Sequence, residues 1–409
     1  MDRWYAAKIG ATLAALFLLV ACGRPQPPQL LEARPVAAGE AVLMGADRSL
    51  EYLPLLKDRR VAVVTNQTGR IGPVHLVDSL VSLGVNVVKV FAPEHGFRGD
   101  SDAGEKIKDG RDPGTGLAVV SLYGTNKQPS PEQLADVDVL LFDIQDVGVR
   151  FYTYISTLHF VMEAAAEQGK QVIVLDRPDP NGFFVDGPIL DPAHSSFVGM
   201  HPVPLVHGMT TGEYALMING EGWLKGGEAC DLKVIPCTGY DHDQLFEPAI
   251  RPSPNLPNGS AIRLYPSLGL FEGTIVSVGR GTDKPFQCIG FPGCSIGRFV
   301  FTPRSMPGAK DPPYKDQACS GLDLQQYGGF RSRMDRRINL QWLLGMYASA
   351  PDRSAFFNTF FDKLAGGPAL RGQVVAGLDE AAIRASWQPG LDAFRLIRSK
   401  YLLYPDFAP

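Results

Sequence analysis

Residues 138–176, DVLLFDIQDVGVRFYTYISTLHFVMEAAAEQGKQVIVLD, decide the fold. The apolar run at 138–144 predicts a buried strand, and 171–176 is a second apolar, β-branched run. Between them, 153–168 carries apolar residues at helical spacing. Strands that are apolar throughout and alternate with helices are typical of a parallel sheet covered on both faces. The segment therefore predicts a strand–helix–strand unit.

The same alternation continues on both sides of this unit. It predicts an α/β fold with a Rossmann-like doubly wound sheet over residues 44–250. No GxGxxG follows the first expected strand, where residues 65–69 read TNQTG, so dinucleotide binding has no support. Further strands are expected at 60–66, 85–92, 118–122 and 231–236, and helices at 74–83 and 213–224.

The pattern changes after residue 250. Proline and glycine become frequent, and helices are expected again at 340–349, 380–387 and 390–403. We interpret 251–409 as a smaller α+β domain. An active-site cleft is expected between the two domains, because ligands commonly bind at such interfaces.

The N-terminus predicts export. Residues 9–21 are apolar but too short to span a bilayer, so residues 1–21 are typical of a signal peptide. The run ends in Leu-Val-Ala-Cys at Cys22, the pattern cut and acylated in bacterial lipoproteins, although an ordinary signal peptide or a buried helix is the alternative. Residues 22–43 then form a proline-rich tether. We expect a lipid-anchored protein, in the outer membrane facing the periplasm if the host is Gram-negative.

The charge and the cysteine content of the chain limit the classes of function and of site that it can have. The formal net charge is −4 with no basic run, so nucleic-acid binding is excluded. An exported protein can form disulfides, and the spacing suggests Cys230 with Cys237 and Cys288 with Cys294, leaving Cys319 free. A zinc site is the rival interpretation, but no CxxC occurs and the histidines are scattered. We expect no metal and no cofactor.

Polar clusters follow the expected strands, where open α/β sheets bind ligands. In FAPEHGFRG (91–99), Glu94 and His95 are neighbours in a turn. A partly desolvated Glu94 would be able to donate a proton to a leaving oxygen. Alternatively, Glu94 and Arg98 form a structural ion pair.

A second cluster, Asp143, Gln145 and Asp146, ends the next strand and is followed by Arg150 and Tyr152. Acidic acceptors beside aromatic surfaces favour sugar binding, although Asp146 can equally stabilise the turn. Asp176 and Arg177 end a further strand. The residues that follow are typical of a turn, so a structural role can explain much of this cluster.

Two more clusters complete the set. His207 precedes Thr210, Thr211 and Glu213, which resemble a helix cap. Glu272, Arg280 and Thr282 lie in a glycine-rich stretch, where an arginine fork suits a carboxylate; a hairpin with surface charges is the alternative. No SxxK or HExxH motif occurs, so paired carboxylates are the chemistry that these clusters favour.

The chain is similar to the NamZ/YbbC family over about residues 44–405. That family consists of exo-acting β-N-acetylmuramidases, which release N-acetylmuramic acid from the non-reducing end of peptidoglycan fragments. The resemblance implies a Rossmann-like domain, a smaller second domain and a cleft between them. It rests on FAPEHGFRG (91–99), DIQDVGVRFYTYI (143–155), LDRPDPNG (175–182), VDGPIL (185–190), PVPLVHGMTTGE (202–213), PNLPN (254–258), FEGTIVSVGRGTDKPFQCIG (271–290) and the tail at 382–404.

The resemblance implies Glu94 as catalytic acid with His95 beside it. Glu272 becomes the second carboxylate, either activating water or acting as nucleophile. Alternatively, the substrate's own 2-acetamido group attacks, oriented by Asp143 or Asp146. Arg280 is the candidate for the lactyl carboxylate of muramic acid. The full set of expected substrate ligands is Asp143, Gln145, Asp146, Arg150, Tyr152, Asp176, Arg177, His207, Arg280 and Thr282.

One departure from the family pattern is Cys288, where a bulkier residue is expected; a disulfide with Cys294 would replace packing there. Two other functions stay open: a non-catalytic, lipid-anchored protein that binds muropeptides, and an esterase or amidase acting on wall peptides. The esterase or amidase has no SxxK or HExxH motif to support it.

Overall fold

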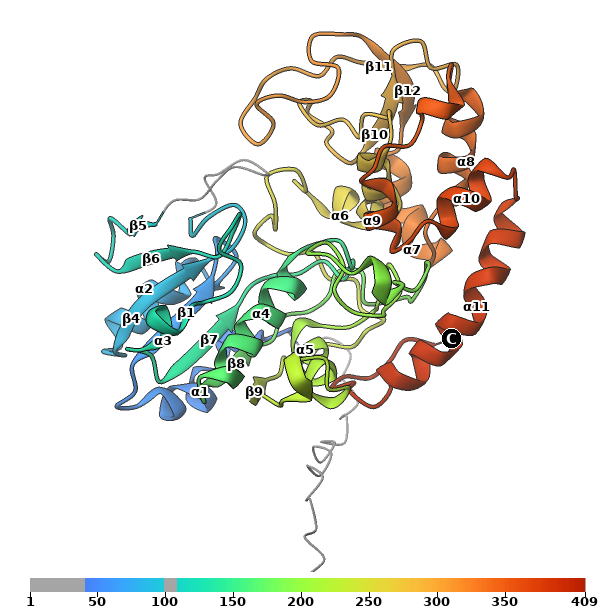
Figure 1. The fold of residues 1–409 in the computed structure, drawn as a ribbon. Helices are drawn as coiled ribbons and strands as arrows, with labels where there is room; N and C mark the ends of the chain where they lie inside the picture. The colour runs from blue at the N-terminus through green and yellow to red at the C-terminus, as the bar shows by residue number, and fades with distance from the viewer. Residues whose placement is uncertain (1–40, 99–108, 409) are drawn as a thin grey trace, which may run out of the picture. The chain divides into compact units, whose positions relative to one another are not determined.

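The computed structural model describes residues 41–98 and 109–408 (Figure 1). The predicted signal peptide, the acylated Cys22 and the tether up to residue 40 therefore lie outside the described residues. Within the described ranges, no helix has both the length and the apolar character needed to cross a membrane.

A seven-stranded sheet runs through the N-terminal half in the order β5-β6-β4-β1-β7-β8-β9. β5 is antiparallel to β6, and the other pairings are parallel. The chain starts at central β1, adds β4 and β6 on one side, and crosses to β7, β8 and β9 on the other. This order confirms the predicted doubly wound, Rossmann-like fold. The strands are β1 Val61–Thr65, β4 Val87–Ala92, β5 Gly110–Arg111, β6 Ala118–Ser121, β7 Val139–Asp143, β8 Gln171–Leu175 and β9 Asp231–Ile235.

Both faces of this sheet are covered, which explains why its strands are apolar without alternation. In β7, Val139 and Leu141 pack into the core with α1 and α2, whereas Leu140 and Phe142 pack on the opposite side with α3, α4 and α5. The helices are α1 Ser49–Leu56, α2 Leu76–Ser82, α3 Pro131–Leu134, α4 Tyr154–Glu167 and α5 Thr211–Gly220.

The C-terminal half adds a small antiparallel sheet and several helices, as Figure 1 shows. Its order is β10-β12-β11, which leaves β11 at an edge. The core on the α4 face continues into this half through α6 and α11. The elements are α6 Gly259–Leu268, β10 Cys288–Phe291, β11 Phe299–Phe301, β12 Cys319–Asp323, α7 Ser332–Asp335, α8 Leu340–Ser349, α9 Phe361–Ala365, α10 Ala369–Val375 and α11 Glu380–Arg398, with short β2 Arg70–Ile71 and β3 Val74–His75 in the N-terminal half.

Two helices differ from expectation. Residues 259–268 form α6, in the proline- and glycine-rich stretch where no helix was expected. The Asn258 side chain caps the helix by accepting from the Ala261 N–H. The two helices expected around Pro389 are one helix, α11. Its apolar stripe continues across the proline, so burial of that face outweighs the one hydrogen bond that Pro389 cannot make.

The disulfide prediction is wrong, because all five described cysteines are free thiols. Cys230 and Cys237 flank β9, whose five extended residues alone span about 13 Å between them. A disulfide requires about 4.4–6.8 Å. Cys288 packs with Phe301 and Cys319, whereas Cys294 lies in the main core, so these two thiols face different clusters.

Candidate active site

Glu94 lies two residues after β4, and the ends of three strands meet at its carboxylate. The Tyr123 hydroxyl, two residues past β6, donates to Glu94 Oε1 at 2.9 Å. The Thr153 hydroxyl, in the loop after β7, donates to Oε2 at 3.4 Å. Burial and the Glu94 carboxylate raise the pKa of Tyr123, so this phenol stays a hydrogen-bond donor. The carboxylate is therefore held in a fixed orientation by groups from neighbouring loops.

The residues around Glu94 are engaged elsewhere. His95 is buried, has a positive φ of 71°, and its Nε2 lies 3.2 Å from the Ser253 hydroxyl. The suggested ion pair of Glu94 with Arg98 is not the arrangement found, since Arg98 binds Asp78 and Asp112 instead. Glu94 is therefore not paired with Arg98, and it lines a pocket.

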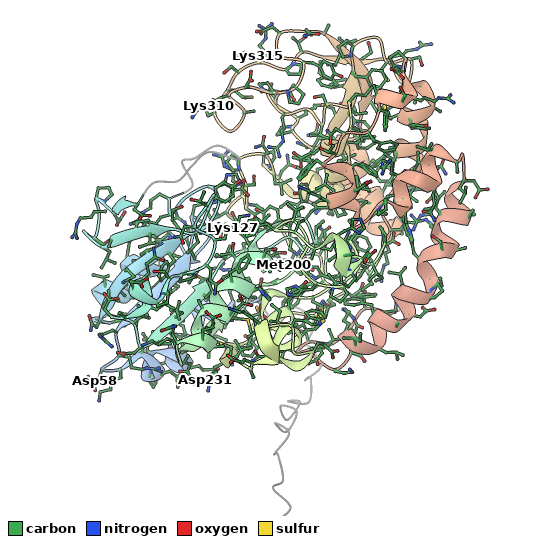
Figure 2. All side chains as sticks on the ribbon, in the orientation of Figure 1. Asp58, Lys127, Met200, Asp231, Lys310 and Lys315 are labelled. Atoms are coloured by element: carbon green, nitrogen blue, oxygen red, sulfur yellow. The ribbon has the colours of Figure 1, made fainter. Side chains whose placement is uncertain are left out.

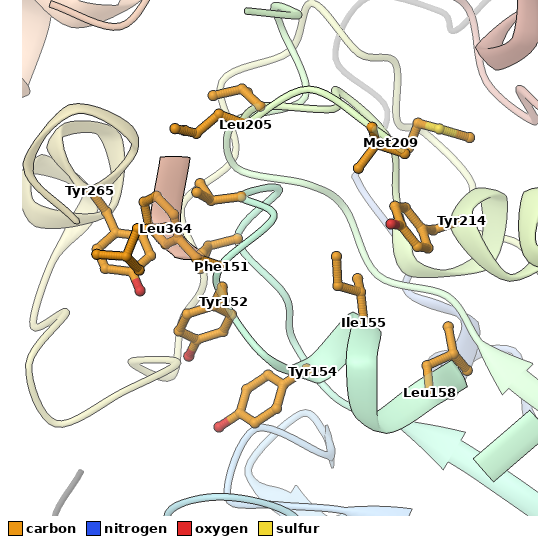
Figure 3. Packing of buried hydrophobic residues seen from close by; sticks show 14 of the residues in the cluster. Phe151, Tyr152, Tyr154, Ile155, Leu158, Leu205, Met209, Tyr214, Tyr265 and Leu364 are labelled. Carbon is orange, nitrogen blue, oxygen red and sulfur yellow. The ribbon is translucent and has the colours of Figure 1, made fainter. Parts of the chain in front are cut away.

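A pocket opens at Glu94 and is walled by both halves of the chain. Its enclosed volume is about 60 Å³, well below the roughly 300–1,000 Å³ of drug-sized ligand pockets, so it encloses only part of a sugar. Aromatic rings dominate it, and Figure 3 shows Phe151, Tyr152, Tyr154 and Tyr265 close together. The lining residues are Glu94, His95, Phe151, Tyr152, Thr153, Tyr154, Ser253, Leu256, Tyr265, Arg280 and Phe286.

Among the described residues that line this pocket, Arg280 carries the guanidinium, and Glu272 holds it. Both Nε and Nη2 of Arg280 donate to Glu272 Oε1, at 3.0 and 2.7 Å. The guanidinium also lies 5.0 Å from the Phe286 ring centre. Burial alone would lower the pKa of Arg280, but the Glu272 carboxylate outweighs burial and the pKa ends above its usual value. Arg280 therefore stays charged beside Glu94.

The sequence placed Glu272 in the reaction itself, whereas the structure places it behind Arg280. Glu272 does not belong to the pocket wall, and it lies in the short helix Gly269–Gly273 that packs on α9. Its geometry is that of a residue that orients Arg280. The alternative of a hairpin with surface charges is not found around Arg280, which is only partly exposed and lines the pocket.

Asp143 and Arg177, both expected to bind substrate, bind each other. Arg177 Nε and Nη2 donate to the two carboxylate oxygens of Asp143, at 2.5 and 3.0 Å. Asp143 has no exposed surface, and burial raises its pKa although Arg177 opposes the shift. This buried pair ties the loop after β7 to the loop after β8. Arg177 also lines a separate hollow of about 200 Å³, with Gln145 and Arg70.

Gln145 and Asp146 hold the loop after β7. The Gln145 side chain donates to the carbonyl oxygens of Asp146 and Pro178. Asp146 Oδ2 accepts from the Gly148 N–H at 2.8 Å, which confirms the turn-stabilising alternative. Burial raises the pKa of Asp146 to about 7. Neither residue lines the Glu94 pocket.

Asp176 and His207 are also structural. Asp176 accepts from the Thr210 hydroxyl, the Gly212 N–H and the Tyr404 hydroxyl, at 2.7, 2.7 and 2.5 Å. Thr210 in turn forms the expected capping box with Glu213. His207 is buried against Tyr214, and burial lowers its pKa to about 3, so the ring is neutral.

Arg150 and Thr282 lie outside the Glu94 pocket as well. Arg150 is wholly buried, and its guanidinium donates only to carbonyl oxygens, those of Pro188, Val203 and Leu364. Thr282 donates to the Gly279 carbonyl and lines a neighbouring hollow. Of the ten expected substrate ligands, Tyr152 and Arg280 line the pocket.

Sequence reasoning missed Tyr123, Ser253 and Tyr265. Tyr123 follows a strand end, as Glu94 does, and this position was the signal that could have identified it. Ser253 and Tyr265 come from the proline-rich loop and from α6, which was not predicted. In the described part of the chain, no group of three or more His, Cys, Asp or Glu side chains is placed to hold a metal ion.

A carboxylate, an arginine and aromatic rings in one pocket, at the edge of a Rossmann-like sheet, indicate the class of glycoside hydrolases. More specifically, the chain belongs to the exo-β-N-acetylmuramidase NamZ family. The N-terminal domain of that family matches residues 61–260, and its C-terminal domain matches residues 263–404.

Three known proteins are similar to this chain over most of its length. The chain is 39% identical, over 89% of its length and 91% of the relative, to the peptidoglycan β-N-acetylmuramidase NamZ of Bacillus subtilis strain 168. It is similar to the crystal structure of a DUF1343 family protein of Bacteroides fragilis, with 44% identity, a TM-score of 0.84 and coverage of 90% and 100% of the two chains. A second DUF1343 structure from that organism has 30% identity, a TM-score of 0.73 and coverage of 89% and 99%.

Proposed function

We propose that this protein is an exo-β-N-acetylmuramidase, which removes N-acetylmuramic acid from the non-reducing end of peptidoglycan fragments. Membership of the NamZ family supports the reaction class. The observation that carries the proposal is the Glu94 carboxylate, held by Tyr123 in a pocket that also contains Arg280.

Glu94 donates its proton to the glycosidic oxygen as the bond to the leaving sugar breaks. Arg280 binds the lactyl carboxylate, the group that distinguishes muramic acid from N-acetylglucosamine, because a guanidinium fork suits a carboxylate. Glu272 keeps Arg280 charged and oriented. Asp143 and Asp146 are buried away from the pocket, so they do not orient the acetamido group in this scheme.

The Glu94→Gln variant tests the proposal. It preserves the shape of the side chain and its capacity to accept from Tyr123, but it removes the proton donor. We expect kcat to fall by about 10²–10⁴-fold on a disaccharide with non-reducing N-acetylmuramic acid. Mass spectrometry of the products measures the turnover. Wild-type turnover in this variant would refute the assignment. Binding without turnover in the wild type would instead favour a muropeptide-binding protein.

We further propose that the protein is exported and held to a membrane by acylated Cys22. The apolar run at 9–21 and the Leu-Val-Ala-Cys sequence support this location. Cys22→Ala should move the protein from the membrane fraction to the soluble fraction. A mass of the purified protein without acyl chains would contradict it.

A further inference from the structure

A separate hollow lies at the carboxyl ends of β1, β7 and β8, and the proposed function does not use it. The chain runs from β1 to β4 and β6 on one side of the sheet, and then crosses to β7 and β8 on the other. The loops after β1 and β7 therefore lie at the point where the strand order reverses, and doubly wound sheets commonly bind ligands there. We call this cavity the switch-point hollow. Its polar wall consists of Asp47, Thr68, Arg70, Gln145 and Arg177.

One loop separates the switch-point hollow from the Glu94 pocket. Residues 248–250 line the hollow, whereas Ser253, further along the same loop, lines the pocket. Gln67 fixes the loop by donating to the Pro252 carbonyl oxygen at 3.2 Å. Among the described residues, none lines both cavities. A ligand in the hollow is therefore distinct from the sugar that reacts at Glu94.

The switch-point hollow is small. Its volume is about 200 Å³, below the roughly 300–1,000 Å³ of drug-sized ligand sites. At about 30 Å³ for each water of the bulk liquid, it holds roughly seven waters. That space suits a single amino acid and not a disaccharide.

Two guanidinium groups line the hollow. Arg177 binds Asp143 through Nε and Nη2, while its Nη1 meets only the Met44 thioether sulfur, at 2.9 Å. A thioether is a weak acceptor, so a ligand oxygen is a better partner for this N–H. The Arg70 guanidinium donates to backbone carbonyl oxygens and forms no ion pair in the described chain. The hollow can therefore bind a carboxylate.

Acceptors for an ammonium group line the same hollow. Asp47 accepts from the Met44 N–H at 2.9 Å and forms no ion pair within residues 41–98 and 109–408. Gln145 is 2% exposed, and its amide nitrogen donates to the carbonyl oxygens of Asp146 and Pro178. The amide oxygen of Gln145 is then left as an acceptor beside the Asp47 carboxylate.

The balance of charge selects the kind of ligand. Arg70 and Arg177 are matched by Asp47 and by Asp143 behind the wall, so the hollow has no excess charge of either sign. A ligand with a single charge would bury the wall group of the same sign without a partner, which is costly. A zwitterion satisfies both signs at once. The wall at 248–250 is Pro-Ala-Ile, which suits a short apolar side chain.

We infer that the switch-point hollow binds a small zwitterionic amino acid. Its carboxylate lies at Arg70 and Arg177, and its ammonium group lies at Asp47 and the amide oxygen of Gln145. Hydrolysis of a glycosidic bond neither consumes nor releases this ligand. The inference therefore does not depend on the proposed function.

Alanine and two analogues test the inference. Propionate lacks the ammonium group, and alaninamide lacks the carboxylate. Isothermal titration calorimetry of the full-length protein gives the dissociation constant of each compound, with alanine measured as both enantiomers. We expect one enantiomer of alanine to bind at least about 10-fold more tightly than either analogue, because each analogue loses a charged partner. Equal binding of alanine and propionate, or no binding of alanine, overturns the inference.

Asp47→Asn locates the ligand in the hollow. Asparagine can still accept from the Met44 N–H, but it removes the charge that faces the ammonium group. The preference for alanine over propionate should therefore fall about 10-fold. Arg70→Gln should lower the preference for alanine over alaninamide by a similar factor, and it gives a result even if Asp47→Asn does not fold.

Asp58→Asn is the matched control. Asp58 is exposed and precedes β1, so it lies at the opposite edge of the sheet, where Figure 2 labels it near Asp231 at the start of β9. Its preference for alanine should equal that of the wild type. Wild-type preferences in both Asp47→Asn and Arg70→Gln would show that alanine binds elsewhere and would overturn the inference. Hydrolysis is measured separately, so this outcome leaves the proposed function standing.

Discussion

The loop after β4 and the loop after β7 leave the same edge of one sheet, yet they place their carboxylates in opposite surroundings. Glu94 is partly exposed, lines a pocket and accepts hydrogen bonds from Tyr123 and Thr153. Asp143 has no exposed surface and is bound by both sides of the Arg177 fork. A carboxylate at a strand end is therefore a candidate for catalysis only where its partners leave it open to a ligand.

The difference has a physical cause. Arg177 reaches Asp143 from the neighbouring strand end, because β7 and β8 are adjacent and parallel. β4 has β1 on one side and β6 on the other, and the groups that reach Glu94 from the loops after β6 and β7 are the hydroxyls of Tyr123 and Thr153. Hydroxyls orient a carboxyl group without placing a charge against it, unlike the Arg177 guanidinium at Asp143.

The difference between the two carboxylates is tested most directly by comparing the stability of Asp143→Asn with that of Glu94→Gln. Asp143→Asn leaves the Arg177 guanidinium buried without a charged partner, which typically costs about 3–5 kcal/mol of unfolding free energy. Glu94→Gln affects a partly exposed group and should change that free energy by no more than about 0.5 kcal/mol. Urea unfolding of both variants measures the contrast. Equal stabilities would mean that the two loops do not differ in the way described.

A second test uses pH to measure the effect of burial on another carboxyl group of the loop after β7, that of Asp146. Its folded-state pKa is about 7 against an ordinary 3.8, because the carboxyl group is buried. Below about pH 4 the group is protonated in both states. Between about pH 4 and 7 the folded protein keeps a proton that the unfolded chain has released, so the contribution of Asp146 to stability falls as pH rises.

Asp146→Asn removes this fall in stability with rising pH, because an amide does not ionise. The amide oxygen can still accept from the Gly148 N–H, so the turn is kept. We expect the stability of the variant relative to wild type to rise by about 2 kcal/mol between pH 5 and pH 7, at most about 1.4 kcal/mol per pH unit. Urea unfolding at pH 5, 6, 7 and 8 measures it, with the exposed Asp58→Asn as control. A pH-independent difference would show that Asp146 does not carry the proton.

The sheet was predictable from sequence because local pattern suffices for it. Apolar runs separated by helical spacing gave β7, α4 and β8 to within one or two residues at each end. α6 was not predictable in this way, because Gly259 and Pro266 are typical of loops and tertiary burial outweighs their low helix propensity. The disulfide prediction was wrong for a similar reason, because the spacing of two cysteines in the sequence does not show how extended the chain between them is.

The site was predictable only in part. Position after a strand singled out Glu94 and the glycine-rich stretch singled out Arg280, and both line the pocket, but sequence does not reveal which charges pair with each other. The Asp143–Arg177 pair joins residues 34 positions apart, and neither residue lines the Glu94 pocket. Glu272 and Arg280 were expected to act separately and instead form one unit. Pairing of this kind is set by three-dimensional neighbours and not by the order of residues.

Tyr123→Phe gives the smallest expected effect, and it tests whether orientation of Glu94 matters. The change removes one hydrogen bond to the carboxylate and leaves the ring in place. A hydrogen bond to a charged group contributes about 1.5–3 kcal/mol, so we expect kcat to fall roughly 10-fold while KM stays near its wild-type value.

The matched control is Tyr401→Phe, because the Tyr401 hydroxyl donates to Glu221 at 2.7 Å outside the pocket. Equal kcat values for the two variants would assign Tyr123 a purely structural role. A rise in KM without a fall in kcat would indicate instead that Tyr123 contacts the substrate, because uniform binding affects KM and transition-state positioning affects kcat.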